Sequence, residues 1–200
     1  MNRTDWDERH ADGTRRWAGG PSPRLVAEVD GLPPGRALDL ACGQGRNAVW
    51  LAARGWRVTA VDFSAVALAK ARARALESGV EVDWVQADLL DFRPHPASWD
   101  LAVMCYLHVP QLDRGTVLRM AASALAPGGT FLLVAHHREN LEHGYGGPHD
   151  PRVLYTESEI AADLPGLEVE RTERLERLVE TDEGERVALD LLVRATRSGS

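Results

Sequence analysis

The chain has 200 residues, of which 44% are hydrophobic and 26% are charged, and its formal net charge is -7. This length and composition predict one globular domain, and the acidic balance argues against nucleic acid as a partner because phosphate binding needs a basic surface. The sequence shows no signal-peptide pattern and no apolar run close to the roughly 20 residues of a membrane helix. We therefore expect a cytoplasmic protein that contacts no membrane.

Residues 1–20 are polar but contain two tryptophans, Trp6 and Trp17. Bulky aromatic side chains in a polar segment indicate that the segment folds onto another surface. We expect an amino-terminal arm that docks on the core or closes over a ligand as a lid, with Trp6 as a candidate substrate contact. Residues 21–197 are then expected to form a single domain.

The first half of the chain alternates helices and strands. In chain order, the expected elements are a helix over 23–30, a strand over 36–41, a helix over 46–54, a strand over 56–61, a helix over 64–78 and a strand over 80–86. Ser64 is a favourable N-cap for the longest of these helices, and Gly79 ends it.

The second half continues this alternation and then changes. It predicts a strand over 99–105, a helix over 111–125, a strand over 130–135, a long loop over 136–154, and strands over 167–178 and 186–195. Thr156 and Glu159 have the spacing of a capping box for a further short helix. The last two strands lack a helix between them, so they pair as a hairpin. The pattern predicts an α/β fold with a mostly parallel sheet, one antiparallel strand and helices on both faces.

Such a sheet binds ligands beyond the carboxyl ends of its strands, and there the first turn is rich in glycine. Gly43-Gln-Gly45-Arg-Asn-Ala48 lets a ligand approach the backbone, and Asp62 at the end of the next strand can accept hydrogen bonds from ribose hydroxyls. A nicotinamide dinucleotide and a phosphate-free adenosyl cofactor fit these features equally well. Asp39 separates them, because a carboxylate beside this turn repels a pyrophosphate and attracts an ammonium group. The sequence therefore favours S-adenosylmethionine.

A third carboxylate, Asp88, follows the third strand. An adenine amino group could donate to it, and Leu89 offers a backbone amide and an apolar face for the ring. Asp39, Asp62 and Asp88 thus end three successive strands, which would place them along one edge of the sheet.

The chain resembles a class I S-adenosylmethionine-dependent methyltransferase in five segments, which are Asp39-Leu-Ala-Cys-Gly-Gln-Gly45, Ala60-Val-Asp62-Phe-Ser64, Ala87-Asp88-Leu89, Asp100 and Leu125-Ala-Pro-Gly-Gly129. The resemblance implies a Rossmann-like three-layer sandwich with seven strands in the order 3-2-1-4-5-7-6. It also implies methyl transfer from S-adenosylmethionine to a small molecule by a monomer or homodimer. The expected cofactor contacts are Asp39, Cys42, Gly43, Gly45, Asn47, Asp62, Phe63, Asp88, Leu89 and Cys105.

The sequence leaves two classes of methyl acceptor open. Asp39 to Asn47 and the aromatic arm resemble small bacterial methyltransferases of the tellurite-resistance and thiopurine kind, which favours a soft sulfur, selenium or tellurium nucleophile. The alternative is a hydroxyl or amine of a natural product, which needs a base, and His108 and His137 are the candidate catalytic bases. Further candidate substrate contacts are His136, Arg138 and Tyr145.

Two other functions share parts of this pattern. The glycine turn alone would also fit an NAD-dependent oxidoreductase, and the fold could serve a non-catalytic cofactor-binding module. We expect no metal, because the two cysteines and the histidines at 136, 137, 143 and 149 lack the spacing of a standard metal site. A sulfonium methyl group is already activated, so neither a metal nor a nucleophilic side chain is required.

Overall fold

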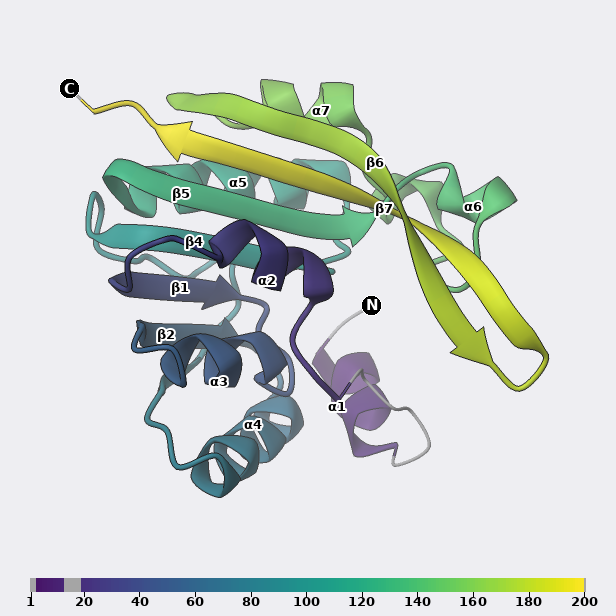
Figure 1. Cartoon of the computed structure of the whole chain (residues 1–200), viewed down its shortest axis with the longest axis horizontal. Helices are drawn as coiled ribbons and strands as arrows, with labels where there is room; N and C mark the ends of the chain where they lie inside the picture. Colours follow the sequence, from purple (N-terminus) through teal and green to yellow (C-terminus); the bar gives the residue numbers. More distant parts are fainter. Residues whose placement is uncertain (1–2, 13–18, 200) are drawn as a thin grey trace.

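The computed structural model describes residues 3–12 and 19–199, so Trp17 lies outside the described residues (Figure 1). Its centre is a seven-stranded sheet in the order β3-β2-β1-β4-β5-β7-β6. The strands are β1 (Arg36–Leu40), β2 (Arg57–Asp62), β3 (Asp83–Gln86), β4 (Trp99–Cys105), β5 (Leu125–His136), β6 (Leu167–Thr181) and β7 (Gly184–Arg197). β7 runs antiparallel to both of its neighbours, and the other pairs are parallel. The expected α/β class and strand order are confirmed.

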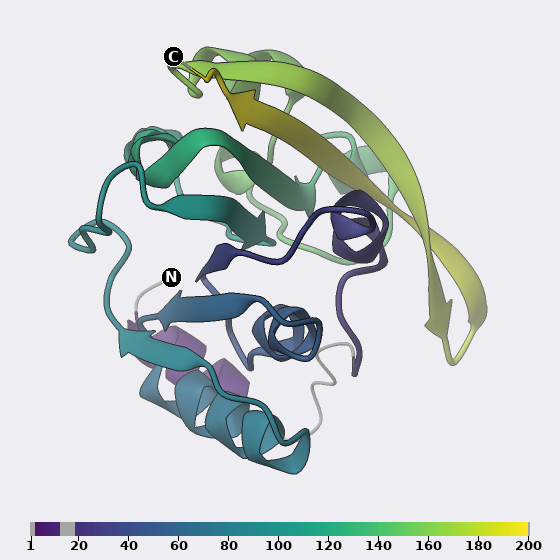
Figure 2. The ribbon, with the colours of Figure 1, turned by 60° about the vertical axis from the view of Figure 1, so that its left-hand side comes forward.

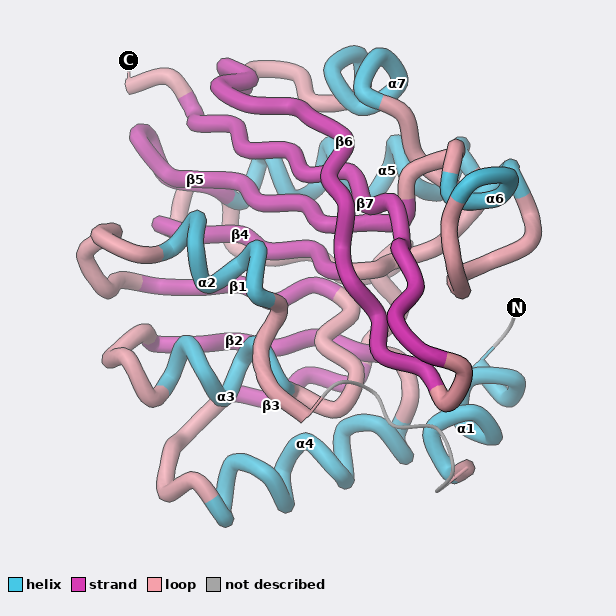
Figure 3. Tube along the Cα trace, turned by 45° about the vertical axis from the view of Figure 1, so that its right-hand side comes forward, coloured by secondary structure: helices cyan, strands magenta, loops and turns pink. Residues whose placement is uncertain are grey.

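Helices cover both faces of the sheet (Figure 3). They are α1 (Arg3–Ala11), α2 (Pro23–Val29), α3 (Arg46–Ala52), α4 (Ala65–Glu77), α5 (Gln111–Ala124), α6 (Asn140–His143) and α7 (Glu157–Ala162), with a 3-10 turn, η1, at Pro151–Val153. Ser64 caps α4 as expected, since its side chain accepts a hydrogen bond from the Ala67 amide at 3.1 Å. Within the described parts of the chain, no helix is long and apolar enough to cross a membrane.

Two hydrophobic cores form, one on each face, because strand side chains alternate in direction. On β1, Ala37 packs with α2, α3 and α4, whereas Leu38 and Leu40 pack with α5 and α7. Asp39 shares the face of Ala37. The carboxylate therefore lies on the side of the sheet where α3 begins.

The β6–β7 hairpin is longer than expected and extends past the end of β5 as an arm that curves away from the sheet (Figure 2). The last β5 residue, His136, pairs in register with Asp190 of β7. The base of the arm therefore lies at the carboxyl edge of β5, where the parallel strands end.

Local contacts explain three differences from the expected elements. β3 begins at Asp83 rather than at residue 80, because the Val80 amide bonds to the Ala75 carbonyl at 3.1 Å and closes α4. β5 begins at Leu125 rather than at residue 130, because Leu125 pairs with Trp99 before the register shifts. The loop over 136–154 is not without structure, since it contains α6 and η1.

The capping box expected at Thr156 and Glu159 was a wrong prediction. The α7 helix begins there, but Thr156 makes no side-chain cap hydrogen bond. Glu159 instead binds two guanidinium groups, those of Arg114 and Arg138.

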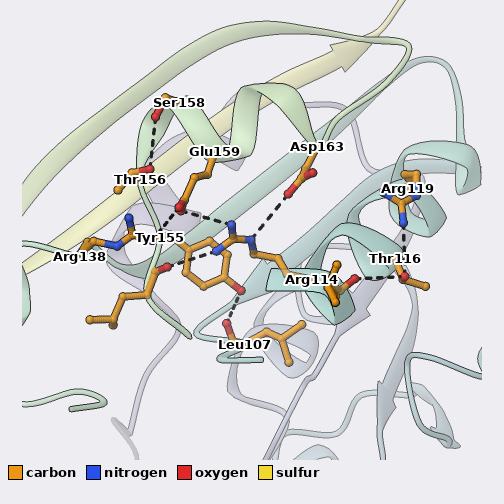
Figure 4. A network of polar contacts seen from close by, with 12 residues as sticks. Leu107, Arg114, Thr116, Arg119, Arg138, Tyr155, Thr156, Ser158, Glu159 and Asp163 are labelled. Atoms are coloured by element: carbon orange, nitrogen blue, oxygen red, sulfur yellow. Dashed lines mark hydrogen bonds and ion pairs between the residues drawn. The ribbon is translucent and has the colours of Figure 1, made fainter. Parts of the chain in front are cut away.

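Arg114 of α5 joins α7 to the segment that follows β4 (Figure 4). Its side chain is buried and lies 3.3 Å from Glu159 Oε2 and 3.8 Å from Asp163 Oδ2. The guanidinium also donates to the Leu154 carbonyl at 3.2 Å and lies over the Tyr155 ring. The Tyr155 hydroxyl in turn donates to the Leu107 carbonyl at 2.5 Å. This network fixes the backbone between Tyr106 and His108.

Candidate functional site

The glycine turn after β1 is built from left-handed residues. Ala41, Gly43 and Gly45 have φ values of 58°, 54° and 74°. A Cβ on Gly45 would lie 2.6 Å from Trp84 Cη2 and 2.8 Å from Ala71 Cβ, whereas the nearest atom to a Cβ on Gly43 is His10 Cε1 at 3.8 Å. Gly45 is therefore required for packing against β3 and α4, and Gly43 leaves room where a ligand would approach.

We expect Gly45→Ala to lower the free energy of unfolding by about 2–4 kcal/mol, because the cost of left-handed alanine adds to that of overpacking. Gly43→Ala is the matched control, with similar backbone strain and no clash, and it should cost about 1–2 kcal/mol. Urea denaturation measures both values. Equal losses would contradict the packing role of Gly45.

Asp39 is a buried carboxylate that makes no side-chain hydrogen bond within the described residues. It is 1% exposed, and neither of its oxygens has a hydrogen-bond partner among residues 3–12 and 19–199. Burial raises the pKa of Asp39 to about 7, with Arg46 opposing the rise and Asp62 adding to it. A buried carboxylate of this kind is stabilised by a cation, which makes it the natural place for an ammonium group.

Asp62 ties the end of β2 to the glycine turn. Its Oδ2 accepts from the Gly43 amide at 2.8 Å, and its Oδ1 accepts from the Ser64 amide at 2.9 Å. Burial raises the pKa of Asp62, and these two hydrogen bonds oppose the rise. Each carboxylate oxygen retains a second lone pair, so the group can still accept from two ribose hydroxyls.

The third carboxylate, Asp88, shapes the turn after β3 by accepting from the Leu90 amide at 3.0 Å. Leu89 beside it is buried. Asp39, Asp62 and Asp88 are therefore all at the carboxyl ends of neighbouring strands β1, β2 and β3, which is the edge where an open α/β sheet binds its ligand.

The other expected cofactor contacts differ in their burial and in their hydrogen bonds. Cys42 and Cys105 are free thiols, and burial raises the pKa of Cys105 to about 12, so it stays uncharged. The Asn47 side chain accepts from the Ser22 amide at 2.9 Å and thereby fixes the entry to α2. The Phe63 carbonyl accepts from the Gln86 side chain at 3.4 Å.

These residues fit S-adenosylmethionine. The orphaned Asp39 carboxylate matches its ammonium group, Asp62 offers acceptors for its ribose, and Gly43 leaves space for its approach. A pyrophosphate would instead meet two buried carboxylates, Asp39 and Asp62, at the same turn.

Helix α1 lies across this turn. Asp7 accepts a hydrogen bond from the Ser64 hydroxyl at 2.5 Å, and Lys70 donates to the His10 carbonyl. His10 is 5% exposed, and its Nδ1 lies 3.4 Å from Gln44 Nε2. Trp6 stacks on His10 with ring centroids 5.6 Å apart, so Trp6 lies beside the cofactor turn.

A second polar cluster, which we call the imidazole cluster, consists of Tyr106, His108, His136, Arg177 and Asp190. Asp190 is buried, and its Oδ2 accepts from the Tyr106 hydroxyl at 2.8 Å and from Arg177 Nε at 2.7 Å. His136 Nδ1 lies 3.3 Å from Asp190 Oδ1, within ion-pair distance but without hydrogen-bond alignment. His108 and His136 stack with ring centroids 5.2 Å apart.

Arg46 connects the imidazole cluster to the carboxylates. Its guanidinium lies 5.6 Å from the Tyr106 ring centroid, and its charge acts on Asp39. Tyr106 has a φ of 61°, a left-handed conformation that is unfavourable for a bulky residue and that tertiary contacts must hold. The cluster therefore borders the cofactor side of the sheet edge.

The structure does not bring all the expected substrate residues to this cluster. His137 points to the other side of β5, where its Nε2 lies 3.1 Å from Glu157 Oε2 and its Nδ1 accepts from the Glu139 amide. Arg138 binds Glu159 at 2.7 Å. Tyr145 is 46% exposed, and its backbone amide bonds to Val187.

Sequence reasoning missed Tyr106, Arg177, Asp190 and Arg46. The sequence does mark Asp190 as a residue that needs buried polar partners, because it is the only charged residue in the apolar run Val187-Ala-Leu-Asp-Leu-Leu-Val193. A charge within a buried strand needs partners, and those partners are the ones that form this cluster.

A separate cavity of about 640 Å³ lies at the opposite edge of the sheet. It is lined by the starts of strands, including Arg36, Arg57 and Trp99. Since ligands of such sheets bind at the carboxyl edge, we assign this cavity no part in cofactor binding.

Comparison with known proteins finds similar sequences and similar folds. Residues 37–129 match a family described as a methyltransferase domain. A ubiquinone biosynthesis O-methyltransferase of Xanthomonas campestris pv. campestris is 36% identical over an aligned length of 153 positions, and the match covers 69% of this chain and 63% of that protein. The chain thus spans less than two thirds of that relative's length.

Two solved structures share the fold over nearly the whole chain. One, from work on the conversion of a disulfide bond into a thioacetal group during echinomycin biosynthesis, has a TM-score of 0.82 at 23% identity, covering 98% of this chain and 93% of that one. The N-methyltransferase NodS of Bradyrhizobium japonicum, in complex with S-adenosyl-L-homocysteine, has a TM-score of 0.74 at 20% identity, covering 98% and 99%.

Proposed function

We propose that the chain is a class I S-adenosylmethionine-dependent methyltransferase and that it methylates a hydroxyl group of a small molecule. The observation that carries the proposal is the pairing of two sites at one sheet edge. The buried carboxylates on β1 and β2 match the cofactor, and the imidazole cluster beside them offers a base for the acceptor.

Each carboxylate has a distinct part in cofactor binding. Asp39 would hold the ammonium group, Asp62 the ribose hydroxyls and Asp88 the adenine amino group. The bound cofactor supplies a methyl carbon activated by the positive charge on sulfur. Burial of Asp39 and Asp62 excludes water from this edge, so the protein's contribution is to orient the acceptor and keep water out.

Two observations support oxygen as the attacking atom. Curated relatives are named as O-methyltransferases. A hydroxyl loses its proton less readily than a thiol, so it gains most from a nearby base such as an imidazole paired with a carboxylate. A sulfur acceptor is the second candidate, supported by the resemblance of the Asp39–Asn47 segment and by the sulfur chemistry named for the echinomycin-related structure.

The direct test is a transfer assay with S-adenosylmethionine that carries a labelled methyl group. Matched small phenols, amines and thiols serve as acceptors, and mass spectrometry identifies the methylated atom. We expect a labelled methyl ether from a phenol. Label only in thioethers would favour the second candidate, and label in no product would contradict both.

We also propose that α1 acts as a lid, because it covers Gly43 and Ser64 through His10 and Asp7. Removing the Asp7 hydrogen bond should raise the population of open lid roughly 5-fold, since one such bond stabilises by about 1 kcal/mol. Stopped-flow binding of S-adenosylhomocysteine should therefore be faster for Asp7→Ala than for the wild type. Glu8→Ala, an exposed change on the same helix, is the control, and equal rates for both variants would exclude a latch at Asp7.

A further inference from the structure

We propose that His136 takes the proton from the acceptor hydroxyl and that Asp190, on the carboxy-terminal hairpin, is the residue that positions its ring. This inference rests on the proposed function, since it names the base for that reaction. It assigns the proton transfer to neither of the histidines that sequence reasoning selected, His108 and His137.

The two carboxylate oxygens of Asp190 have different partners. Tyr106 and Arg177 Nε donate to Oδ2, while Oδ1 faces His136 Nδ1 at 3.3 Å and Arg177 Nη2 at 3.4 Å. Burial disfavours the charged form of Asp190, but its contacts with His136, Arg177 and Tyr106 outweigh this and lower its pKa to about 2. A fixed negative charge therefore faces Nδ1, which favours a proton on Nδ1 and a free lone pair on Nε2.

The alignment of His136 Nδ1 with Asp190 is imperfect in this structure. Hydrogen bonds of catalytic groups are commonly long before the substrate binds and tighten in the complex. Asp190 itself is held by three donor groups of two residues, Tyr106 and Arg177, so it forms a fixed partner for the imidazole.

The other two histidines, His108 and His137, do not suit this role. Burial lowers the pKa of His108 to about 3, with the neighbouring His136 adding to the effect, so His108 cannot hold a proton near neutral pH. Both ring nitrogens of His137 are engaged, one with Glu157 and one with the Glu139 amide. His136 alone among the three combines a carboxylate at one nitrogen with a position in the cluster.

Gly147 packs against the imidazole ring of His136. A Cβ on Gly147 would lie 2.8 Å from His136 Cδ2 and 3.0 Å from Nε2. That Cβ would also lie 3.0 Å from Cγ, so Gly147 packs over the face of the imidazole ring. A larger residue at this position would displace the ring from its place beside Asp190.

The proton and electrons balance without another reactant. The acceptor oxygen passes its proton to His136 Nε2 while its electron pair forms the bond to the methyl carbon. The bond between that carbon and sulfur breaks, and its electron pair stays on sulfur, which becomes neutral. Asp190 stabilises the imidazolium that results, and solvent removes the proton afterwards.

The first experiment compares pH profiles with a phenol and with a matched thiol. A base must be neutral, so the wild-type rate with the phenol should fall at acidic pH. His136→Gln should lower kcat for the phenol roughly 100- to 10,000-fold and remove the acidic limb of the profile, with little change for the thiol. His143→Gln, an exposed change on α6, is the control that should leave both rates unchanged.

The second experiment does not depend on turnover. Nitrogen-15 NMR of the histidine rings should show the His136 proton on Nδ1 in the wild type and a shift toward the other tautomer in Asp190→Asn. Asp190 and asparagine have the same shape, and bound S-adenosylhomocysteine reports that the variant is folded. An unchanged tautomer would overturn the role of Asp190.

Gly147→Ala provides a further check against Gly146→Ala. Both glycines have left-handed φ values, 80° and 71°, but only a Cβ at 147 meets another atom within 4 Å. Gly147→Ala should slow phenol methylation more than Gly146→Ala does. Both variants should bind S-adenosylhomocysteine with the same affinity. Equal rates for the two variants would show that the position of the His136 ring does not control the reaction.

The outcomes separate this inference from the proposed function. Methyl ether formation at full rate by His136→Gln, or loss of the acidic limb in His137→Gln instead, would overturn the inference and leave the proposed function standing. Failure of the folded wild type to methylate any phenol would overturn the proposed function itself.

Discussion

Asp39→Asn is expected to stabilise the cofactor-free protein while it abolishes most of the cofactor affinity. The folded-state pKa of about 7 lies above the ordinary value of 3.8, so the unfolded chain releases this proton first as pH rises. Below pH 3.8 the Asp39 carboxyl is protonated in both states and does not lower the free energy of unfolding. As pH rises from 3.8 through about 7, the free energy of unfolding falls, because folding must then bury a group that is ionised in the unfolded chain. Asparagine carries no charge and avoids that loss.

The size of the effect follows from two opposing costs. A carboxylate with this pKa shift costs up to about 4 kcal/mol at pH 8, and an unpaired buried amide costs about 1–3 kcal/mol. We expect a net gain of about 1–3 kcal/mol for Asp39→Asn at pH 8 and none at pH 4. The substitution also removes the negative charge that attracts the ammonium group of the ligand. This loss should weaken S-adenosylhomocysteine binding roughly 10- to 100-fold.

Thermal melts between pH 4 and pH 8, with and without S-adenosylhomocysteine, measure both effects. The variant should melt higher than the wild type only toward pH 8, and the ligand should raise its melting temperature less. For the wild type, affinity should fall as pH drops below about 7, because ligand binding then has to remove the Asp39 proton. A variant that melts lower at pH 8 and keeps the full ligand shift would contradict the role of Asp39.

Arg114→Ala is expected to cause the largest loss of stability, about 3–5 kcal/mol, because it leaves two carboxylates facing an emptied buried site. Those carboxylates, Glu159 and Asp163, lie 3.3 and 3.8 Å from the guanidinium (Figure 4). The Leu154 carbonyl loses its donor as well. Since the Tyr155 ring packs on Arg114 and its hydroxyl holds Leu107, the segment that carries Tyr106 and His108 should also loosen.

Arg119→Ala on the same helix is the matched control. Arg119 is exposed, and its guanidinium contacts the Thr116 hydroxyl at 3.4 Å, so its removal should cost less than about 1 kcal/mol. Urea denaturation gives the free energy of unfolding for each variant. Losses within about 1 kcal/mol of each other would show that the buried network is not a main support of α7.

The positions of the residues proposed to hold the cofactor were predictable because the signals for them are local. The turn at Gly43 and Gly45, the Ser64 cap and the carboxylates after successive strands are set by short segments and by the alternation of strands and helices. Parallel strands then bring their carboxyl ends to one edge without any further information.

The acceptor half depends on contacts that the sequence does not display. Asp190 reaches Tyr106 and His136 only through the register of β7 on β5, over a separation of 84 residues for Tyr106. His136 and His137 are adjacent, and adjacent residues along a strand point to opposite faces of the sheet. A shift of one residue in the strand therefore decides which of the two histidines reaches the imidazole cluster. The sequence offered both histidines as candidates, and the structure separates them.

We infer that the acidic strand ends hold an adenosyl cofactor with a cationic amino-acid end. A crystal structure of the complex with S-adenosylhomocysteine tests this binding mode most directly. We expect the ammonium group beside Asp39, the ribose hydroxyls on Asp62 and the sulfur facing the imidazole cluster. A ligand bound elsewhere, or one whose carboxylate rather than its ammonium group faces Asp39, would contradict the claim.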